Sequence, residues 1–281
     1  MATEAPGQEQ AIAGAGGTRL YTWRLPAPQP KAAAVILHGY GEHSGRHAEL
    51  ARALAGLGLS CYLLDLRGHG RSGGPRGAIL SWEEYLRDLD LFLAQVAAWQ
   101  GGPPALLLGH SLGGLLAASY VLERPHPFRL LALSSPLFAV GQDVSGLKQM
   151  AGRLLSRWLP RVSLPTEIQP EMLSHDPEVG RAYMADPLVH RVGNVRWFSE
   201  TLAARDRCLA RAHELTVQGL LVLYGQDDAL VDPAGTRDFC GRVRLADLTC
   251  RGYPGMYHEV FNELGREQVL AELSAWLGER L

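Results

Sequence analysis

Residues 106–114 carry the sequence LLLGHSLGG, in which an apolar run stops at Gly109 and a serine follows between glycines. The stretch LLAASYVL at 115–122 is typical of a buried helix. We therefore predict a strand, a tight turn and a helix, with the pattern G-x-S-x-G at the turn. A serine on so sharp a turn has a strained backbone and an exposed hydroxyl, and needs neighbours without side chains at Gly109 and Gly113. Ser111 is therefore a candidate nucleophile, and the helix N-terminus beside it favours a developing oxyanion.

Strand and helix patterns alternate on both sides of this turn. Largely apolar runs, typical of strands buried on both faces, lie at 32–37, 59–64, 130–133 and 219–225. An edge strand at 19–24 and a last strand at 246–251 are also expected, with helices at 47–57, 82–99, 233–240 and 265–281. This alternation predicts a mostly parallel central sheet with helices on both faces. Ligands bind such sheets at the carboxyl ends of the strands, where the polar, glycine-rich clusters 38–46, 65–74, 109–114 and 134–136 fall.

The alternation breaks between residues 137 and 214, where no clear strand is seen. An amphipathic helix is expected at 147–159, with Lys148, Arg153 and Arg157 on its polar face, and a second helix at 196–208. The predicted domains are a flexible N-terminal tail at 1–17, a core at 18–136 and 215–281, and an inserted helical cap at 137–214.

A serine hydroxyl needs an adjacent base, and the base needs a carboxylate that fixes its tautomer. On a fold with such a turn, these groups follow in the order serine, acid, histidine. The acids after the strand at 219–225 are Asp227, Asp228 and Asp232. We favour Asp228, because Asp232 stands where a helix cap is needed and Asp227 suits a solvated turn. His258, in the loop after the last predicted strand, is the candidate base.

The other histidines have simpler interpretations. Surface or hinge positions are expected for His126, His175, His190 and His213, and other tasks in the loops near the site for His38, His43, His69 and His110. An oxyanion hole needs two donors, and one is the backbone N–H after the nucleophile, that of Leu112. The loop HGYG at 38–41 can supply the other through the Tyr40 N–H, because its glycines let the backbone approach a substrate closely.

The composition excludes several partners. The 281 residues carry a formal net charge of −2, which favours neither nucleic acid nor strongly anionic surfaces. No apolar run reaches the length of a transmembrane segment, and residues 1–17 do not resemble a secretory signal. We therefore expect a cytoplasmic protein that touches membranes only at their surface.

Four cysteines, Cys61, Cys208, Cys240 and Cys250, show no C-x-x-C spacing. Neither a disulfide framework nor a zinc site is expected from this spacing. Cys61 and Cys250 fall in predicted strands, where we expect them as small buried side chains. No metal or cofactor is expected.

Five motifs together resemble a known family: residues 38–46, 65–72, 109–114, 134–136 and 257–260. The chain resembles α/β-hydrolases, and within them the monoacylglycerol lipase and lysophospholipase-like group, from about residue 18 to its end. The resemblance implies a triad of Ser111, Asp228 and His258 and an oxyanion hole from the Tyr40 and Leu112 amides. It also implies that the cap receives an acyl chain and helps the protein to dock on lipid surfaces. One departure is His47, where the family usually has tyrosine, and it affects a local contact.

We expect a serine carboxylic ester hydrolase that cleaves monoacylglycerol to glycerol and free fatty acid through an acyl-enzyme intermediate. One alternative is a lysophospholipase, for which Arg153, Arg157 and Arg161 could hold the phosphate unless they form a solvated basic face. A broad short- or medium-chain carboxylesterase and a non-catalytic interaction protein on the same fold are the others.

Overall fold

The computed structural model describes residues 7–141, 161–166 and 168–281. Its centre is an eight-stranded sheet with the strand order β1-β2-β4-β3-β5-β6-β9-β10. The strands are β1 Gln8–Ala13, β2 Arg19–Leu25, β3 Ala32–Leu37, β4 Leu59–Leu64, β5 Leu106–His110, β6 Leu130–Ser134, β9 Gly219–Gly225 and β10 Leu248–Tyr253. Neighbouring strands pair in parallel along the series β4, β3, β5, β6, β9 and β10. Strand β2 pairs antiparallel with β4, and β1 pairs antiparallel with β2. The prediction of a mostly parallel α/β sheet is therefore confirmed.

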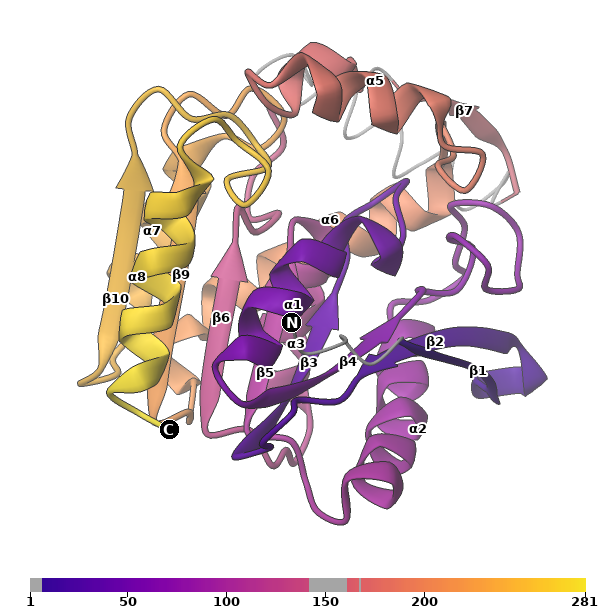
Figure 1. Cartoon of the computed structure of the whole chain (residues 1–281). Helices are drawn as coiled ribbons and strands as arrows, with labels where there is room; N and C mark the ends of the chain where they lie inside the picture. Colours follow the sequence, from indigo (N-terminus) through magenta and orange to yellow (C-terminus); the bar gives the residue numbers. More distant parts are fainter. Residues whose placement is uncertain (1–6, 142–160, 167) are drawn as a thin grey trace.

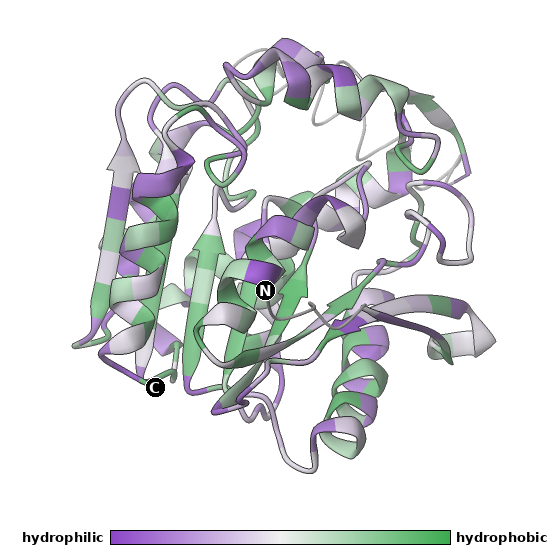
Figure 2. Ribbon diagram, in the orientation of Figure 1, coloured by the Kyte–Doolittle hydropathy of each residue, from purple (hydrophilic) through white to green (hydrophobic). Residues whose placement is uncertain are grey.

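Helices cover both faces of the sheet (Figure 1). On one face, α1 (Ala48–Gly56) and α8 (Arg266–Gly278) pack on the strands. On the other face, α2 (Glu83–Gln100), α3 (Leu112–Glu123) and α7 (Pro233–Arg242) do so. Within β3, Ala34 and Ile36 join the first core, and Val35 and Leu37 join the second. Because successive side chains point to opposite faces, a strand covered on both sides must be apolar at most positions. Figure 2 shows the central strands as hydrophobic along their length.

The expectation of a frayed tail at 1–17 is wrong for residues 8–17. Residues 8–13 form β1, which pairs along its length with β2, and Ala15 donates its N–H to Asp88 Oδ1 at 2.8 Å. The strand QEQAIA is mostly exposed, so backbone pairing holds it more than apolar burial does. Its polar composition therefore carries no strand signal.

The region predicted as a cap contains more than helices. Two short strands, β7 (Ser163–Pro165) and β8 (Val192–Asn194), pair antiparallel, so the expectation of no strand is wrong. The helices are α5 (Pro177–Ala185) and α6 (Val195–Arg211), with 3₁₀ turns at Pro170–Met172 and Ala212–Glu214. α6 confirms the predicted second helix. The helix predicted at 147–159, with Arg153 and Arg157, lies outside the described residues. Figure 1 shows α5 beyond the carboxyl ends of the strands.

Two cysteines are paired, against expectation. Cys240 on α7 and Cys250 on β10 form a disulfide, with their Cα atoms 6.6 Å apart. Cys250 is exposed rather than buried, because β10 is an edge strand. Cys61, on the inner strand β4, is buried as predicted. The pairing depends on how a helix packs beside a strand, which residue spacing does not reveal. Within the described residues, no helix combines the length and the hydropathy needed to cross a bilayer.

Candidate active site

Ser111 lies at the turn between β5 and α3, with φ 53° and ψ −115°. Few residues other than glycine adopt this left-handed region, and strain of this kind clusters at functional sites. A Cβ on Gly109 would overlap the Gly113 carbonyl, and a Cβ on Gly113 would overlap the carbonyl of Leu37. Both neighbours must therefore be glycine, as the motif predicts.

The turn is held by its neighbours in the sheet. The Ser111 N–H donates to the Ser134 carbonyl at 2.9 Å, and the Ser111 carbonyl accepts from Leu115 and Leu137 at 3.1 and 3.0 Å. The end of β6 thus fixes the turn from one side and α3 fixes it from the other. The backbone strain at Ser111 is sustained by these surrounding contacts.

Asp228 and His258 are directly bonded, with Asp228 Oδ2 2.7 Å from His258 Nδ1 and both residues buried. Asp228 Oδ1 accepts the backbone N–H groups of Leu230 and Val231, each at 2.9 Å. The carboxylate is therefore oriented by its own loop and presents one oxygen to the imidazole. This bond leaves Nε2 of His258 as the nitrogen free to take a proton.

The rival acids have other surroundings. Asp232 accepts the Ala234 N–H at 2.8 Å and caps α7, as expected. Asp227 is exposed in the turn after β9. Of the three acids, Asp228 is the one whose carboxylate contacts His258.

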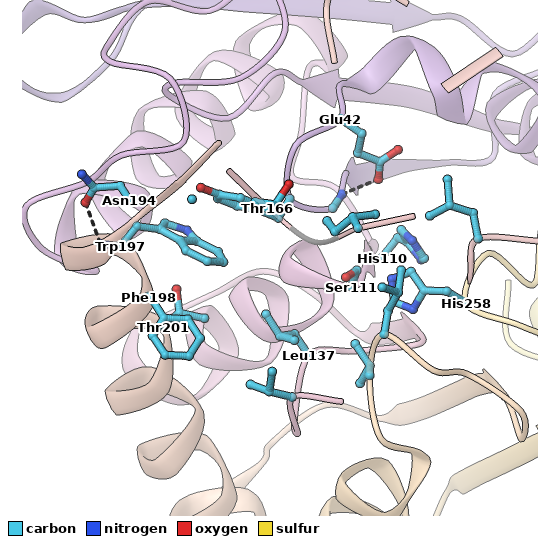
Figure 3. A pocket seen from close by; sticks show the side chains of 18 of the residues that line it. Glu42, His110, Ser111, Leu137, Thr166, Asn194, Trp197, Phe198, Thr201 and His258 are labelled. Atoms are coloured by element: carbon cyan, nitrogen blue, oxygen red, sulfur yellow. Dashed lines mark hydrogen bonds between the residues drawn. The ribbon is translucent and has the colours of Figure 1, made fainter. Parts of the chain in front are cut away.

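Ser111 and His258 line the same cavity of about 730 Å³ (Figure 3). In the described part of the chain, no hydrogen bond joins the Ser111 hydroxyl to the His258 ring. Catalytic hydrogen bonds of this kind are often long without substrate and tighten when it binds. The serine and the imidazole are thus brought to one cavity wall, where together they can activate a hydroxyl.

The pKa values of the two histidines beside Ser111, His110 and His258, are shifted in opposite directions. Burial opposes a charge on His258, but the Asp228 carboxylate outweighs it and raises the pKa of His258. Burial and the nearby His258 hold the pKa of His110 well below its usual value. The two rings lie 4.8 Å apart between centroids. His258 is therefore the stronger base of the pair, and His110 stays neutral beside it.

The loop at 38–41 packs against Ser111, because a Cβ on Gly39 would lie 3.2 Å from the Ser111 Cβ. His38 holds the loop: its Nδ1–H donates to the Gly39 carbonyl at 2.7 Å and its Nε2 accepts the Leu66 N–H at 2.9 Å. Burial lowers the pKa of His38, and only the neutral ring can make both bonds. The loop is thereby anchored to the chain after β4.

Tyr40 in this loop is tethered by its side chain. Its hydroxyl lies 2.8 and 2.9 Å from the carbonyls of Gly77 and Val192, and its ring stacks on Trp197 at 3.6 Å. Leu112 is the first residue of α3, so its N–H has no acceptor within the helix. The amides of Tyr40 and Leu112 therefore belong to the two segments that border Ser111.

A charged cluster that the sequence did not indicate lies beside this loop. The Arg46 guanidinium bonds Glu42 at 2.9 Å and Glu259 at 2.7 and 2.9 Å. Glu42 also accepts the Gly39 N–H at 2.6 Å. Burial opposes its charge, but His47 and Arg46 hold the pKa of Glu42 well below its usual value. Nε2 of His47, the residue where the family usually has tyrosine, lies 3.1 Å from Oε1 of Glu42.

The rest of the cavity is mostly apolar, although Asn194, Thr201 and Arg205 also line it. Its wall comes from α6 and from the chain around it, with the residues Leu137, Val140, Leu164, Trp197, Phe198 and Leu202. Figure 3 shows several of these side chains surrounding the space in front of Ser111. In the described ranges, no group of three or more His, Cys, Asp or Glu side chains is arranged to bind a metal ion. The cavity thus joins an apolar chamber to a polar, charged corner.

The other histidines take structural places. His43 pairs with Asp186 at 2.8 Å, and His175 lies 3.1 Å from Glu263. His69 and His190 pack around the Tyr40 ring at centroid distances of 5.2 Å. Contacts between distant segments of the chain place these rings, and no local sequence signal marks them.

Residues 28–265 match the protein family described as serine aminopeptidase, S33. The chain is 34% identical over 275 residues to a monoacylglycerol lipase of Mycolicibacterium smegmatis, covering 97% of this chain and 98% of the relative. It is 30% identical to phospholipase YtpA of Bacillus subtilis, covering 92% of this chain and 98% of that one. The crystal structure of a monoacylglycerol lipase of Paleococcus ferrophilus superposes with a TM-score of 0.84 at 31% identity, over 92% and 98% of the two chains.

Proposed function

The chain belongs to the serine hydrolase family described as serine aminopeptidase S33, and from that premise we propose that it cleaves monoacylglycerol to glycerol and a free fatty acid. The cavity carries this proposal. It places a strained serine and a carboxylate-bound histidine at the junction of an apolar chamber and a polar corner. A single-chain lipid ester has the same division into an apolar chain and a polar alcohol.

In the proposed mechanism, Ser111 attacks the ester carbonyl while His258 Nε2 takes its proton. Asp228 keeps the other ring nitrogen protonated and stabilises the imidazolium that forms. The amides of Tyr40 and Leu112 donate to the oxyanion of the tetrahedral intermediate. His258 then protonates the departing glycerol, and water, activated by the same histidine, releases the fatty acid from the acyl-enzyme.

The charged corner favours an uncharged alcohol over a phosphate. Two carboxylates, Glu42 and Glu259, share the guanidinium of Arg46 there, and His47 lies 3.1 Å from Glu42. The Arg46 guanidinium is thus already paired with carboxylates and is not free to bind a phosphate head group, whereas glycerol hydroxyls can donate to the carboxylates. The likeness to a phospholipase keeps lysophospholipid as the second candidate substrate. Of the arginines considered for its phosphate, Arg161 is exposed and Arg153 and Arg157 lie outside the described residues.

Cap side chains also support contact with lipid surfaces as part of the proposal. Leu164 and Met184 are 56% and 42% exposed, and Leu164 lines the cavity as well. An exposed apolar side chain that also lines the apolar chamber, as Leu164 does, suits a substrate that is delivered from a lipid aggregate.

A substrate panel tests the proposed function. Hydrolysis of mono-, di- and triacylglycerols, lysophospholipids and graded p-nitrophenyl esters is measured under the same conditions. We expect monoacylglycerol to have the highest kcat/KM, with lysophospholipid slower by at least about tenfold, as expected for an anionic group that meets no unpaired cation among the described residues of this corner. A higher kcat/KM for lysophospholipid than for monoacylglycerol would show that the proposed substrate, with glycerol as its leaving alcohol, is wrong.

The pH dependence of kcat/KM tests the role of His258. The base must be neutral to accept the Ser111 proton, and the Asp228 carboxylate raises the pKa of His258 above the ordinary 6.5. Activity is therefore expected to fall as the pH decreases through a midpoint above 6.5. The measurement is a profile of kcat/KM for a soluble p-nitrophenyl ester between pH 5 and 9 in buffers of constant ionic strength. A rate that stays flat down to pH 5 contradicts this role.

A further inference from the structure

Glu263 is a buried carboxylate that the proposed mechanism does not use, and it is 1% exposed. Its Oε1 accepts the N–H groups of His175 and Leu264, each at 2.8 Å, and the Ser174 hydroxyl at 3.0 Å. Its Oε2 accepts the Tyr257 N–H at 3.1 Å and lies 3.1 Å from His175 Nδ1. Five donors thus converge on one side chain, and a carboxylate, which only accepts, matches them all.

The donors come from two segments far apart in sequence. Residues 174 and 175 belong to the cap side of the molecule, and residues 257 and 264 flank the loop that carries His258. The same two segments meet in further contacts: the Ser174 hydroxyl oxygen also lies 3.1 Å from the Asn262 carbonyl, and the His175 ring stacks on Tyr257 at 3.7 Å. Glu263 is the centre of a joint between these segments.

The joint holds the backbone on both sides of His258. Before it, the Tyr257 N–H donates to Glu263. After it, the Glu259 N–H donates to the Leu173 carbonyl at 2.8 Å. Leu173 itself lines the cavity, next to the segment that Glu263 binds. The histidine backbone is therefore clamped at both neighbouring amides by one unit made of residues 173–175 and Glu263.

Glu263 is ionised in this setting. Burial opposes its charge, but the backbone N–H donors, that of Tyr257 first, outweigh that effect and lower the pKa of Glu263. Hydrogen bonds from several N–H groups to a charged carboxylate are stronger than those to a neutral acceptor. A glutamine in either orientation would turn its amide NH₂ toward at least one backbone N–H, which can only donate.

We propose that Glu263 is a positioning residue: by joining residues 173–175 to the loop at 257–264, it sets the His258 ring at the distances from Asp228 and Ser111 that proton transfer requires. The inference rests on the proposed role of His258. Displacing a catalytic base by about 1 Å costs on the order of 100-fold in rate. Disturbing the joint should therefore slow the chemistry without changing how the cavity binds its substrate.

The test is the variant Glu263→Gln, with Glu267→Gln as the matched control at an exposed position at the start of α8. Its readouts are the rate of Ser111 labelling by a fluorophosphonate as a function of pH, and kcat and KM for a soluble p-nitrophenyl ester. For the variant we expect labelling and kcat to fall about 10- to 100-fold, with KM within about twofold. The acidic midpoint should also move to lower pH, because a lengthened Asp228–His258 bond no longer raises the pKa of His258.

Glu263→Asp, which keeps the charge, should recover part of the lost rate, and Glu267→Gln should behave as wild type. A folded Glu263→Gln that is labelled at the wild-type rate with an unchanged midpoint overturns the proposal. His175→Ala decides the question if Glu263→Gln does not fold, because it removes one donor and the ring contact to Tyr257 while leaving the carboxylate in place. It should slow labelling several-fold, and unchanged labelling in that folded variant also overturns the proposal.

Labelling by a fluorophosphonate does not depend on a lipid substrate, so the two proposals fail separately. If the wild-type enzyme is labelled at Ser111 but does not hydrolyse monoacylglycerol, the proposed substrate is wrong and the proposed role of Glu263 is unaffected. A wild-type enzyme that is not labelled overturns both.

Discussion

Replacing Ser111 with alanine is expected to lower kcat for ester hydrolysis by about 10⁴- to 10⁶-fold, the range found when a serine nucleophile is removed. Alanine has no hydroxyl, so no acyl-enzyme can form, and only binding and oxyanion stabilisation remain. The thermal midpoint should change little, since in the described part of the chain the Ser111 hydroxyl makes no hydrogen bond. The measurements are p-nitrophenyl ester hydrolysis and the mass increase after fluorophosphonate treatment.

Ser135→Ala is the control for this experiment. Ser135 is a second buried serine with a positive φ, 42°, and its hydroxyl has no partner within the described residues. Losing that hydroxyl should leave kcat within about twofold of wild type, because it is not part of the proposed machinery. Near wild-type turnover by the purified Ser111→Ala variant would contradict the proposed mechanism.

Replacing Asp228 with asparagine is expected to reduce kcat by about 10³- to 10⁴-fold. Asparagine can still accept the N–H groups of Leu230 and Val231, so the loop should keep its shape. Its amide can donate to His258 Nδ1, which places the proton on the nitrogen that should receive it from Ser111. The loss of the carboxylate also removes the charge that raises the pKa of His258, so the acidic midpoint should move to lower pH. The pH profile of kcat/KM and the labelling rate measure both effects.

Asp227→Asn and Asp232→Asn are the matched controls for this variant. Asp227 is exposed, and asparagine caps a helix about as well as the aspartate at 232 does. Both variants should retain kcat within about twofold. If either of them, rather than Asp228→Asn, shows the large loss, the acid of the triad has been misassigned.

The core of the fold was predictable because its signals are local. A strand covered on both faces must be largely apolar, so 32–37, 59–64 and 219–225 are recognisable from composition alone. Strand β1 was missed, because it is exposed and held by backbone pairing. The short pair β7–β8 was missed because strands of three residues show no detectable period.

The candidate site likewise contains residues that the sequence indicates and residues that it does not. The glycines that its turn requires mark Ser111 in the sequence, and the order of serine, acid and histidine indicates Asp228 and His258. The charged corner gave no such signal, because Arg46 and Glu259 are 213 residues apart. The Cys240–Cys250 disulfide also escaped prediction, since the spacing of two cysteines says nothing about how a helix and a strand pack.

The sequence by itself determined the alternation of strands and helices, the strained turn at Ser111 and the family to which the chain belongs. Each of these depends on residues close together in the chain or on motifs that recur as units. Tertiary structure alone decided what lines the cavity and which carboxylate clamps the histidine loop. Glu263 lies 88 residues from His175, and only folding brings its single charge within reach of donors from both segments. A side chain acts through what it touches, and long-range contacts are a property of the folded chain.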